Sequence, residues 1–131
     1  MKKIVFTALL LLPFFGTAQK NTTTEFDSAF AHSVYFWLKQ PESAEDRAQF
    51  EAALQKFLDN SKYAKTNFLG IPPKAVREVV DDSFTYNLIV TFESAAAQQA
   101  YQEEKAHLVF IEECKDLWQR VVVYDALGIA P

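Results

Sequence analysis

Residues 31–39, AHSVYFWLK, decide how this chain is expected to fold. The run is rich in aromatic and β-branched residues, has the length of a strand, and ends at Gln40-Pro41. Because successive side chains of a strand point to opposite faces, the run divides into two sets. One face carries His32, Val34, Phe36 and Leu38, and the other carries Tyr35 and Trp37. Both faces of the expected strand therefore hold large apolar groups.

Similar strand patterns recur farther along the chain. Strands are expected at residues 63–71, 84–92 and 117–126, and residues 76–80 are a candidate for an additional short strand. In the run at 84–92, Leu88, Val90 and Phe92 oppose Ile89, so this strand is also apolar on both faces.

Helix patterns separate the strands. Ser43 is a candidate N-cap for a helix that reaches about residue 60, because acidic residues fill its first turn and apolar residues recur at helical spacing. Ser94 begins a second helix, which breaks near Lys105 before a further helical stretch at 107–116. The order β-α-β-β-α-β predicts an α+β, ferredoxin-like sandwich, an antiparallel sheet with its helices on one face.

The face of the sheet opposite the helices predicts an assembly. Its large side chains are Tyr35, Trp37, Ile89, Val122 and Tyr124. An antiparallel sheet whose second face meets water is normally polar there, and an apolar patch of this size marks an interface. We therefore expect a homodimer whose two sheets stack, burying on the order of 2,000 Å² or more. The alternative is that the N-terminal leader or the C-terminal segment, both short and polar, folds over this face.

The composition is that of one globular domain. Of the 131 residues, 50% are hydrophobic and 23% are charged, which is the balance of a single packed unit. Asp and Glu outnumber Lys and Arg by 17 to 13, and no cluster of basic residues occurs. A nucleic-acid partner is not expected, since such a partner requires a basic surface.

The N-terminus has the pattern of a secretory signal peptide. Lys2 and Lys3 precede an apolar run at residues 4–15, and small residues end at Ala18. We expect residues 1–18 to be removed, residues 19–30 to form a flexible leader, and the product to be periplasmic or extracellular with no membrane attachment. A retained membrane anchor is the weaker alternative, because the run is short for a bilayer. The only cysteine, Cys114, cannot form an internal disulfide and is expected to be a small buried side chain.

Four segments together resemble the stress-responsive dimeric α/β-barrel (Dabb) family. They are AHSVYFWLK at 31–39, FTYNLIVTFES at 84–94, AYQEEKAH at 100–107 and LWQRVVVYD at 117–125. The resemblance covers residues 31–126 and leaves 127–131 as a C-terminal tail. It implies a ferredoxin-like fold whose sheets pair across a dimer into a barrel, in agreement with the two-faced strands.

The resemblance also implies candidate site residues. The family includes olivetolic acid cyclase, a plant enzyme without metal or cofactor, in which a Tyr and the second His of a Tyr-x-x-His-Pro-x-His segment are catalytic. These positions fall on Tyr101 and His107, whereas the central His-Pro is replaced here by Glu104-Lys105. The first-strand His of the family matches His32. The family's pocket positions match Phe50, Trp118, Val121 and Val123, and Val34 and Phe36 point to the same side as His32.

A tyrosine and a histidine over an apolar pocket suit carbonyl chemistry. A neutral imidazole takes a proton from a carbon next to a carbonyl, and a phenol hydrogen-bonds the enolate that forms. Tyr101 and His107 lie on either side of the expected helix break, so we expect their side chains to converge. The structural alternative is that His107 starts the last helix, Tyr101 is a core aromatic residue and His32 is hydrogen-bonded within the sheet. A metal site is not expected, since no ligand pair has a metal-site spacing.

Two functions of different classes follow from these patterns. The first is an exported homodimer that binds a small apolar or aromatic molecule between helices and sheet, without turnover. The second is a cofactor-independent acid/base enzyme, a cyclase, lyase or isomerase that uses His107 and Tyr101. The plant cyclase's own substrate arises from intracellular coenzyme A chemistry, so an exported protein is not expected to share that activity.

Overall fold

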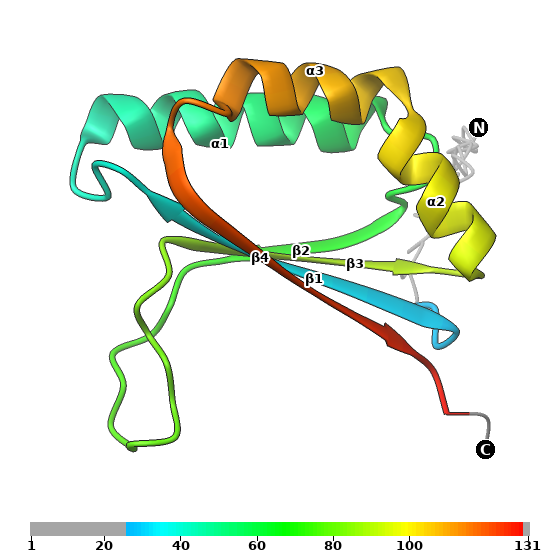
Figure 1. The fold of residues 1–131 in the computed structure, drawn as a ribbon, viewed down its shortest axis with the longest axis horizontal. Helices are drawn as coiled ribbons and strands as arrows, with labels where there is room; N and C mark the ends of the chain where they lie inside the picture. The colour runs from blue at the N-terminus through cyan, green and yellow to red at the C-terminus, as the bar shows by residue number, and fades with distance from the viewer. Residues whose placement is uncertain (1–25, 130–131) are drawn as a thin grey trace, which may run out of the picture.

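A four-stranded antiparallel sheet lies beneath a layer of helices in the computed structural model, which describes residues 26–129 (Figure 1). The strands are β1 (Phe30–Leu38), β2 (Thr66–Gly70), β3 (Tyr86–Phe92) and β4 (Trp118–Leu127). The helices are α1 (Ala44–Asn60), α2 (Ala95–Glu103) and α3 (Lys105–Cys114). The element order confirms the predicted ferredoxin-like α+β fold. The expected signal peptide and most of the expected leader lie outside the described residues.

The sheet has the order β2-β3-β1-β4, so β1 is a central strand. His32 of β1 is opposite Val90 on one side and Asp125 on the other. The burial of β1 alternates strictly, with every second side chain from Phe30 to Leu38 buried against the helices. This alternation confirms the expected division of residues 31–39 into two faces.

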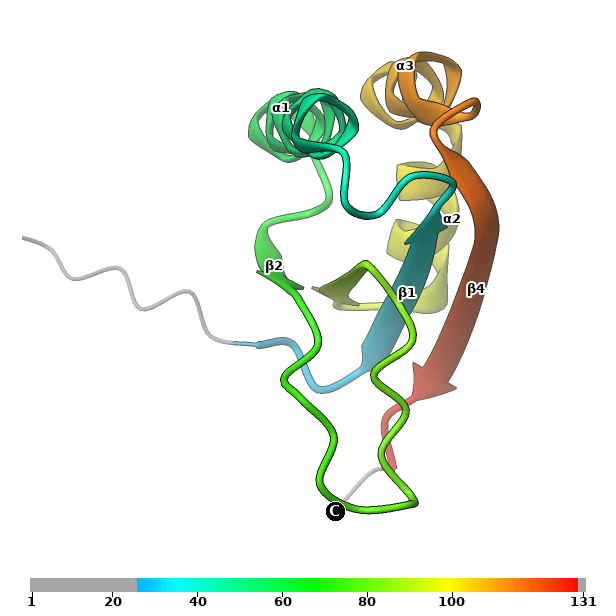
Figure 2. The same ribbon diagram turned by 90° about the vertical axis from the view of Figure 1, so that its left-hand side faces the viewer.

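The expected short strand at residues 76–80 is wrong. Residues 71–85 form a loop that leaves the sheet on the side away from the helices (Figure 2). Pro72 and Pro73 follow the end of β2 after one residue, and a proline has no N–H to donate to a neighbouring strand. The loop is instead held by its own contacts, such as the Ala75 N–H that donates to Asp82 Oδ2 at 2.7 Å. Val76 and Val79 are consequently 87% and 86% exposed.

Both predicted N-caps are confirmed. Ser43 Oγ accepts the backbone N–H of Asp46 at 3.2 Å, and Ser94 Oγ accepts that of Ala97 at 3.1 Å. Each bond satisfies one of the free amides at a helix start. The buried residues of α1 are Phe50, Ala53, Leu54, Phe57 and Leu58, which repeat at helical spacing and face the sheet.

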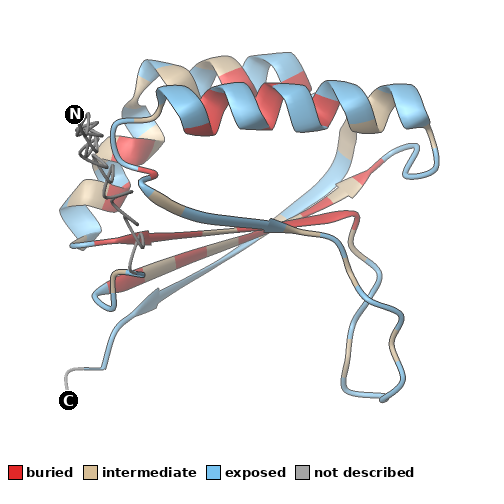
Figure 3. Ribbon diagram, turned by 180° about the vertical axis from the view of Figure 1, so that it is seen from behind, coloured by how far each residue is buried: buried red, intermediate tan, exposed pale blue. Residues whose placement is uncertain are grey.

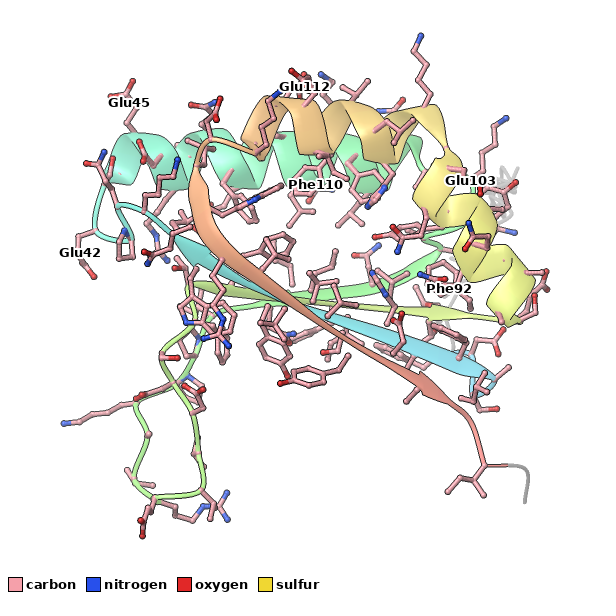
Figure 4. The ribbon with its side chains drawn as sticks, viewed as in Figure 1. Glu42, Glu45, Phe92, Glu103, Phe110 and Glu112 are labelled. Atoms are coloured by element: carbon pink, nitrogen blue, oxygen red, sulfur yellow. The ribbon has the colours of Figure 1, made fainter. Side chains whose placement is uncertain are left out.

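The core lies between the helix layer and the sheet, where the buried residues of both layers meet (Figure 3). Phe110 lies on the sheet-facing side of α3, whereas Glu112 lies on its solvent side (Figure 4). The ring of Phe36 on β1 meets the rings of Phe50 and Phe110 at centroid distances of 5.0 and 6.2 Å. Full burial of one such side chain stabilises the fold by about 1.5–3 kcal/mol. Cys114 is also buried there, and burial raises the pKa of its thiol to about 11.

Within residues 26–129, no helix covers the opposite face of the sheet (Figure 1). Tyr35, Trp37, Ile89 and Val122 are half-buried on it, and Tyr124 is 65% exposed. Phe68, which is paired with Ile89 and 51% exposed, adds a further apolar side chain that the sequence patterns did not indicate.

Polar side chains also lie on this uncovered face. Asn87 and Thr91 of β3 are buried, and each is hydrogen-bonded within the sheet. Asn87 Nδ2 donates to Ser33 Oγ at 3.2 Å, and the Thr91 and Thr66 hydroxyls lie 2.5 Å apart. The face is therefore a mixture of aromatic and aliphatic groups with satisfied polar groups, not a purely apolar surface.

Candidate active site

A cavity of about 320 Å³ lies between the sheet and the two C-terminal helices. Its polar side chains are His32 of β1, Tyr101 and Gln102 of α2, and His107 of α3. Its apolar lining consists of Val34, Phe36, Leu88, Phe110, Ile111, Trp118, Val121 and Val123. Val121 and Val123 on the edge strand β4 are 38% and 46% exposed, so the cavity opens toward that edge.

The break between α2 and α3 brings Tyr101 and His107 together. Glu104 is extended, with φ −67° and ψ 147°, so the helix ends after Glu103 and begins again at Lys105. The Tyr101 and His107 rings lie 5.0 Å apart between centroids. Phe57 of α1 packs against both rings, at 5.4 and 5.3 Å. The two side chains thus meet across the expected break.

His32 completes a group of three polar rings. It is 2% exposed, and its ring lies 5.5 Å from that of Tyr101 between centroids. Its Nδ1 lies 2.6 Å from Asp125 Oδ1 on the paired strand β4. Because a carboxylate only accepts hydrogen bonds, Nδ1 carries the proton that it donates to Asp125.

His107 is fixed in the same tautomer by the backbone. Its Nδ1 lies 3.0 Å from the carbonyl oxygen of Gln102, which also only accepts. Burial lowers the pKa of His107, the nearby His32 lowers it further, and the Gln102 carbonyl and Glu104 oppose this shift. His107 is therefore neutral near pH 7, with the lone pair of Nε2 available to accept a proton.

Tyr101 is held in its protonated form. Burial raises its pKa well above the ordinary value for a phenol, and the negative charges of Glu104 and Asp125 raise it further. Its hydroxyl forms no hydrogen bond with another residue in the range 26–129, and no polar side-chain atom in that range is both fully buried and without a partner, so the hydroxyl is open to the cavity. A phenol that donates beside a neutral imidazole that accepts is an arrangement suited to carbonyl compounds.

Phe50 is one predicted pocket residue that does not line the cavity. It is completely buried, and its ring stacks on Tyr86 at 4.8 Å. It also meets the cavity-lining rings of Phe36 and Trp118, at 5.0 and 6.4 Å. Phe50 therefore lies one layer behind the cavity and supports its wall.

Several site residues were missed by sequence reasoning. Asp125 orients His32, and Gln102 contributes the carbonyl that orients His107. Finding Asp125 required the register between β1 and β4, which no local pattern specifies. Leu88 could have been found from the strand alternation. It shares a face with Val90 and Phe92, whereas Ile89 points to the opposite face.

A second cavity, of about 310 Å³, lies between α1 and α3 on the other side of Phe57 and Phe110. Lys56 and Glu113 face each other there, with Nζ 2.5 Å from Oε1. It contains none of the polar rings described above. Over the described part of the chain, no group of three His, Cys, Asp or Glu side chains is placed to hold a metal ion, and no helix is long and apolar enough to cross a membrane.

A protein family and several solved structures are similar to this chain. The family model of the stress responsive A/B barrel domain matches residues 30–127. The hydroxynitrile lyase of Passiflora edulis is 20% identical with a TM-score of 0.67, covering 79% of this chain and 96% of that chain. A Dabb family protein of Mesorhizobium loti with a ferredoxin-like fold is 16% identical with a TM-score of 0.63, covering 77% and 97%. A dimeric ferredoxin-like protein of Thermobifida fusca is 14% identical with a TM-score of 0.61, covering 79% and 94%.

At these identities the likeness to solved structures shows the fold alone. No curated protein matches the sequence. The family model, however, spans nearly all of the described residues, including every side chain that lines the cavity. The chain therefore belongs to the stress responsive A/B barrel domain (Dabb) family.

Proposed function

We propose that the protein binds a small aromatic or apolar molecule that carries a carbonyl group, in the cavity between β1, β4 and the C-terminal helices. The observation that carries this proposal is the hydroxyl of Tyr101, which lies beside the neutral ring of His107 in a cavity whose remaining walls are mainly apolar. A phenol hydroxyl that faces a cavity can donate to a ligand or a water molecule there. Apolar walls with a few convergent polar groups are typical of small-molecule sites.

The fluorescent aryl ketone prodan tests this proposal. Its emission moves to shorter wavelength in an apolar site and responds to hydrogen bonding at its carbonyl. We expect saturable binding by the wild-type chain, and loss of binding in Val123→Trp, which fills the mouth of the cavity. Val79→Trp is the matched control, because residue 79 lies in the exposed loop. Equal emission changes in both variants and the wild type would refute binding in this cavity.

The second candidate function is acid/base catalysis on a carbonyl substrate. It is favoured by one specific feature, the close approach of a protonated phenol and a neutral imidazole whose tautomer is fixed. The hydroxynitrile lyase neighbour supports this candidate only by showing that the same fold serves an enzyme.

The step would be removal of a proton from the carbon next to the carbonyl. His107 Nε2 takes the proton, the C–H electron pair forms the new C=C bond, and the carbonyl π electrons move to oxygen. Tyr101 donates a hydrogen bond to that oxygen as its negative charge develops. The Asp125 carboxylate holds the His32 ring, which also contacts the ring of Tyr101.

Exchange of the methyl protons of acetophenone in heavy water tests this step directly. The enzyme candidate predicts exchange with the wild type at pH 7 and a loss of about 10²-fold or more with His107→Gln. Prodan binding to His107→Gln should persist, since the apolar walls are unchanged. Binding without exchange would leave the first function and eliminate the second.

We also propose that two copies pair through the uncovered sheet face. The half-buried Tyr35, Trp37 and Ile89 and the exposed Phe68 and Tyr124 support this assembly, because no element of the described chain covers them. The Thermobifida fusca neighbour is described as dimeric.

Export remains a proposal that rests on the N-terminal sequence. The positive start, the apolar run at residues 4–15 and the small residues before Gln19 support it. The mass of the chain recovered outside the cytoplasm should correspond to a first residue of Gln19. Recovery of the intact chain in the cytoplasm alone would contradict it.

A further inference from the structure

One residue, Glu104, separates α2 from α3. Its N–H bonds to the Tyr101 carbonyl at the end of α2, and its own carbonyl accepts the Leu108 N–H at 3.2 Å at the start of α3. Tyr101 precedes this break by three residues and His107 follows it by three. With a single extended residue between two helices, the φ and ψ angles of that residue set the direction of α3.

The Glu104 side chain does not cap α3. It forms no hydrogen bond with the first amides of that helix, and Glu is not among the residues favoured at an N-cap. Its two carboxylate oxygens reach instead to the end of α1, where Oε1 accepts the Ser61 hydroxyl and Oε2 accepts the Lys62 N–H at 3.0 Å. Ser61 Oγ in turn accepts the Ala64 N–H at 2.9 Å.

The contacts around Glu104 therefore connect the helix break to a separate, ordered part of the fold. Ser61 is the C-cap residue of α1, and its backbone N–H bonds to the Phe57 carbonyl at 2.9 Å. Phe57 is the residue whose ring packs against both Tyr101 and His107. The end of α1 thus contacts the Tyr101–His107 pair through Phe57 and holds the break through Ser61.

We propose that Glu104 is the positioning residue of the binding site, whose carboxylate ties the α2–α3 break to α1 and so holds His107 against Tyr101. This inference rests on the proposed function, because it assigns Glu104 a role toward the two polar groups of that cavity.

The charge of Glu104 adds a second effect that can be separated from the tie. It raises the pKa of Tyr101 and opposes the burial and the neighbouring His32 that lower the pKa of His107. Asp125 is the other acidic group that acts on Tyr101. Removing the charge while keeping the tie should therefore lower the pKa of His107 further without moving its ring.

Proton NMR of the two histidines tests the proposal on the full chain. His32 and His107 are the only histidines, so His107→Gln assigns both sets of ring signals. The aromatic rings of Tyr101 and Phe57 shift the ring-proton signals of His107 from their ordinary positions. In Glu104→Ala we expect these signals to return toward ordinary positions, because the α2–α3 break is no longer bonded to the end of α1.

Two variants separate the tie from the charge. Glu104→Gln removes the charge and keeps one of the two acceptor oxygens, so it can retain one of the two bonds. It should lower the pKa of His107 and shift the His107 ring signals less than Glu104→Ala does. Glu103→Ala removes the neighbouring exposed carboxylate, whose hydrogen-bond partner among residues 26–129 is Gln99, and should match the wild type. Ser61→Ala removes one donor of the tie and should shift His107 in the same direction as Glu104→Ala, which keeps the test valid if Glu104→Ala does not fold.

Unchanged His107 signals in folded Glu104→Ala, or in Ser61→Ala if the former is unfolded, would overturn the proposal, even if the melting temperature fell. Failure of the wild type to bind prodan would refute the proposed function but would leave the NMR comparison intact. The two failures are therefore distinguishable.

Discussion

His107 is the residue whose ionisation most directly reports the character of the site. Its pKa is lowered mainly by burial, so the folded chain binds this proton less readily than the unfolded chain does. The free energy of unfolding should therefore fall as pH decreases from about 6.5, the ordinary value for histidine, to the lowered pKa of the folded state. Above that range the residue has no effect on the pH dependence.

Urea unfolding between neutral and mildly acidic pH measures this contribution. The wild type should lose stability over that range more steeply than His107→Gln, which has no titrating group at this position. Parallel stability curves for the two chains would show that His107 is not held neutral by burial.

Phe50 illustrates how a pocket position can act from behind the cavity wall. It is completely buried among Phe36, Tyr86 and Trp118. Phe50→Ala should lower the free energy of unfolding by about 3–5 kcal/mol, measured with urea at fixed protein concentration. Val76→Ala, which truncates an 87% exposed side chain, should change it by less than about 0.5 kcal/mol. Similar effects from the two substitutions would contradict the assignment of Phe50 to the core.

Individual site residues were predicted from the sequence in two ways, by strand phase and by the family resemblance that pointed to Tyr101 and His107. The phase of residues 31–39 put His32, Val34 and Phe36 on one face, and the structure finds all three at the cavity. Asp125 and Gln102 were not found, because they act through a strand register and a backbone carbonyl. Neither a strand register nor the position of a backbone carbonyl can be predicted from the type of residue.

At the scale of elements, alternation and capping residues were sufficient to predict the strands and helices, since Ser43 and Ser94 act as N-caps. The start of β2 was placed three residues early, at 63 instead of Thr66. The error at residues 76–80 has a clear cause, because valine content favours a strand while Pro72-Pro73 direct the chain away from the sheet.

The loop at residues 71–85 should be the least protected part of the described chain. Few backbone hydrogen bonds hold it. One of them joins the Val80 N–H to the Arg77 carbonyl oxygen at 3.0 Å. Hydrogen–deuterium exchange followed by mass spectrometry should show fast exchange in this loop and slow exchange in β1, which is paired on both sides. Protection of residues 76–80 equal to that of β1 would indicate that these residues pair with another strand.

For the whole molecule, the uncovered sheet face makes a prediction about mass in solution. Sedimentation of the wild type should give the mass of two chains. Ile89→Lys, which places a charge near the centre of that face, should give the mass of one chain, since an unpaired buried charge is strongly unfavourable. Val79→Lys is the control in the exposed loop and should remain dimeric. A wild type that sediments as one chain would contradict the assembly.

The account's central claim is that the cavity bounded by His32, Tyr101 and His107 holds a small carbonyl compound. Titration of the chain with prodan, followed through the ring signals of its two histidines, tests this claim at the site itself. Saturable shifts of both His32 and His107 signals, absent in Val123→Trp, are the predicted result. Signals of both rings that stay in place at saturating prodan concentration would contradict the claim.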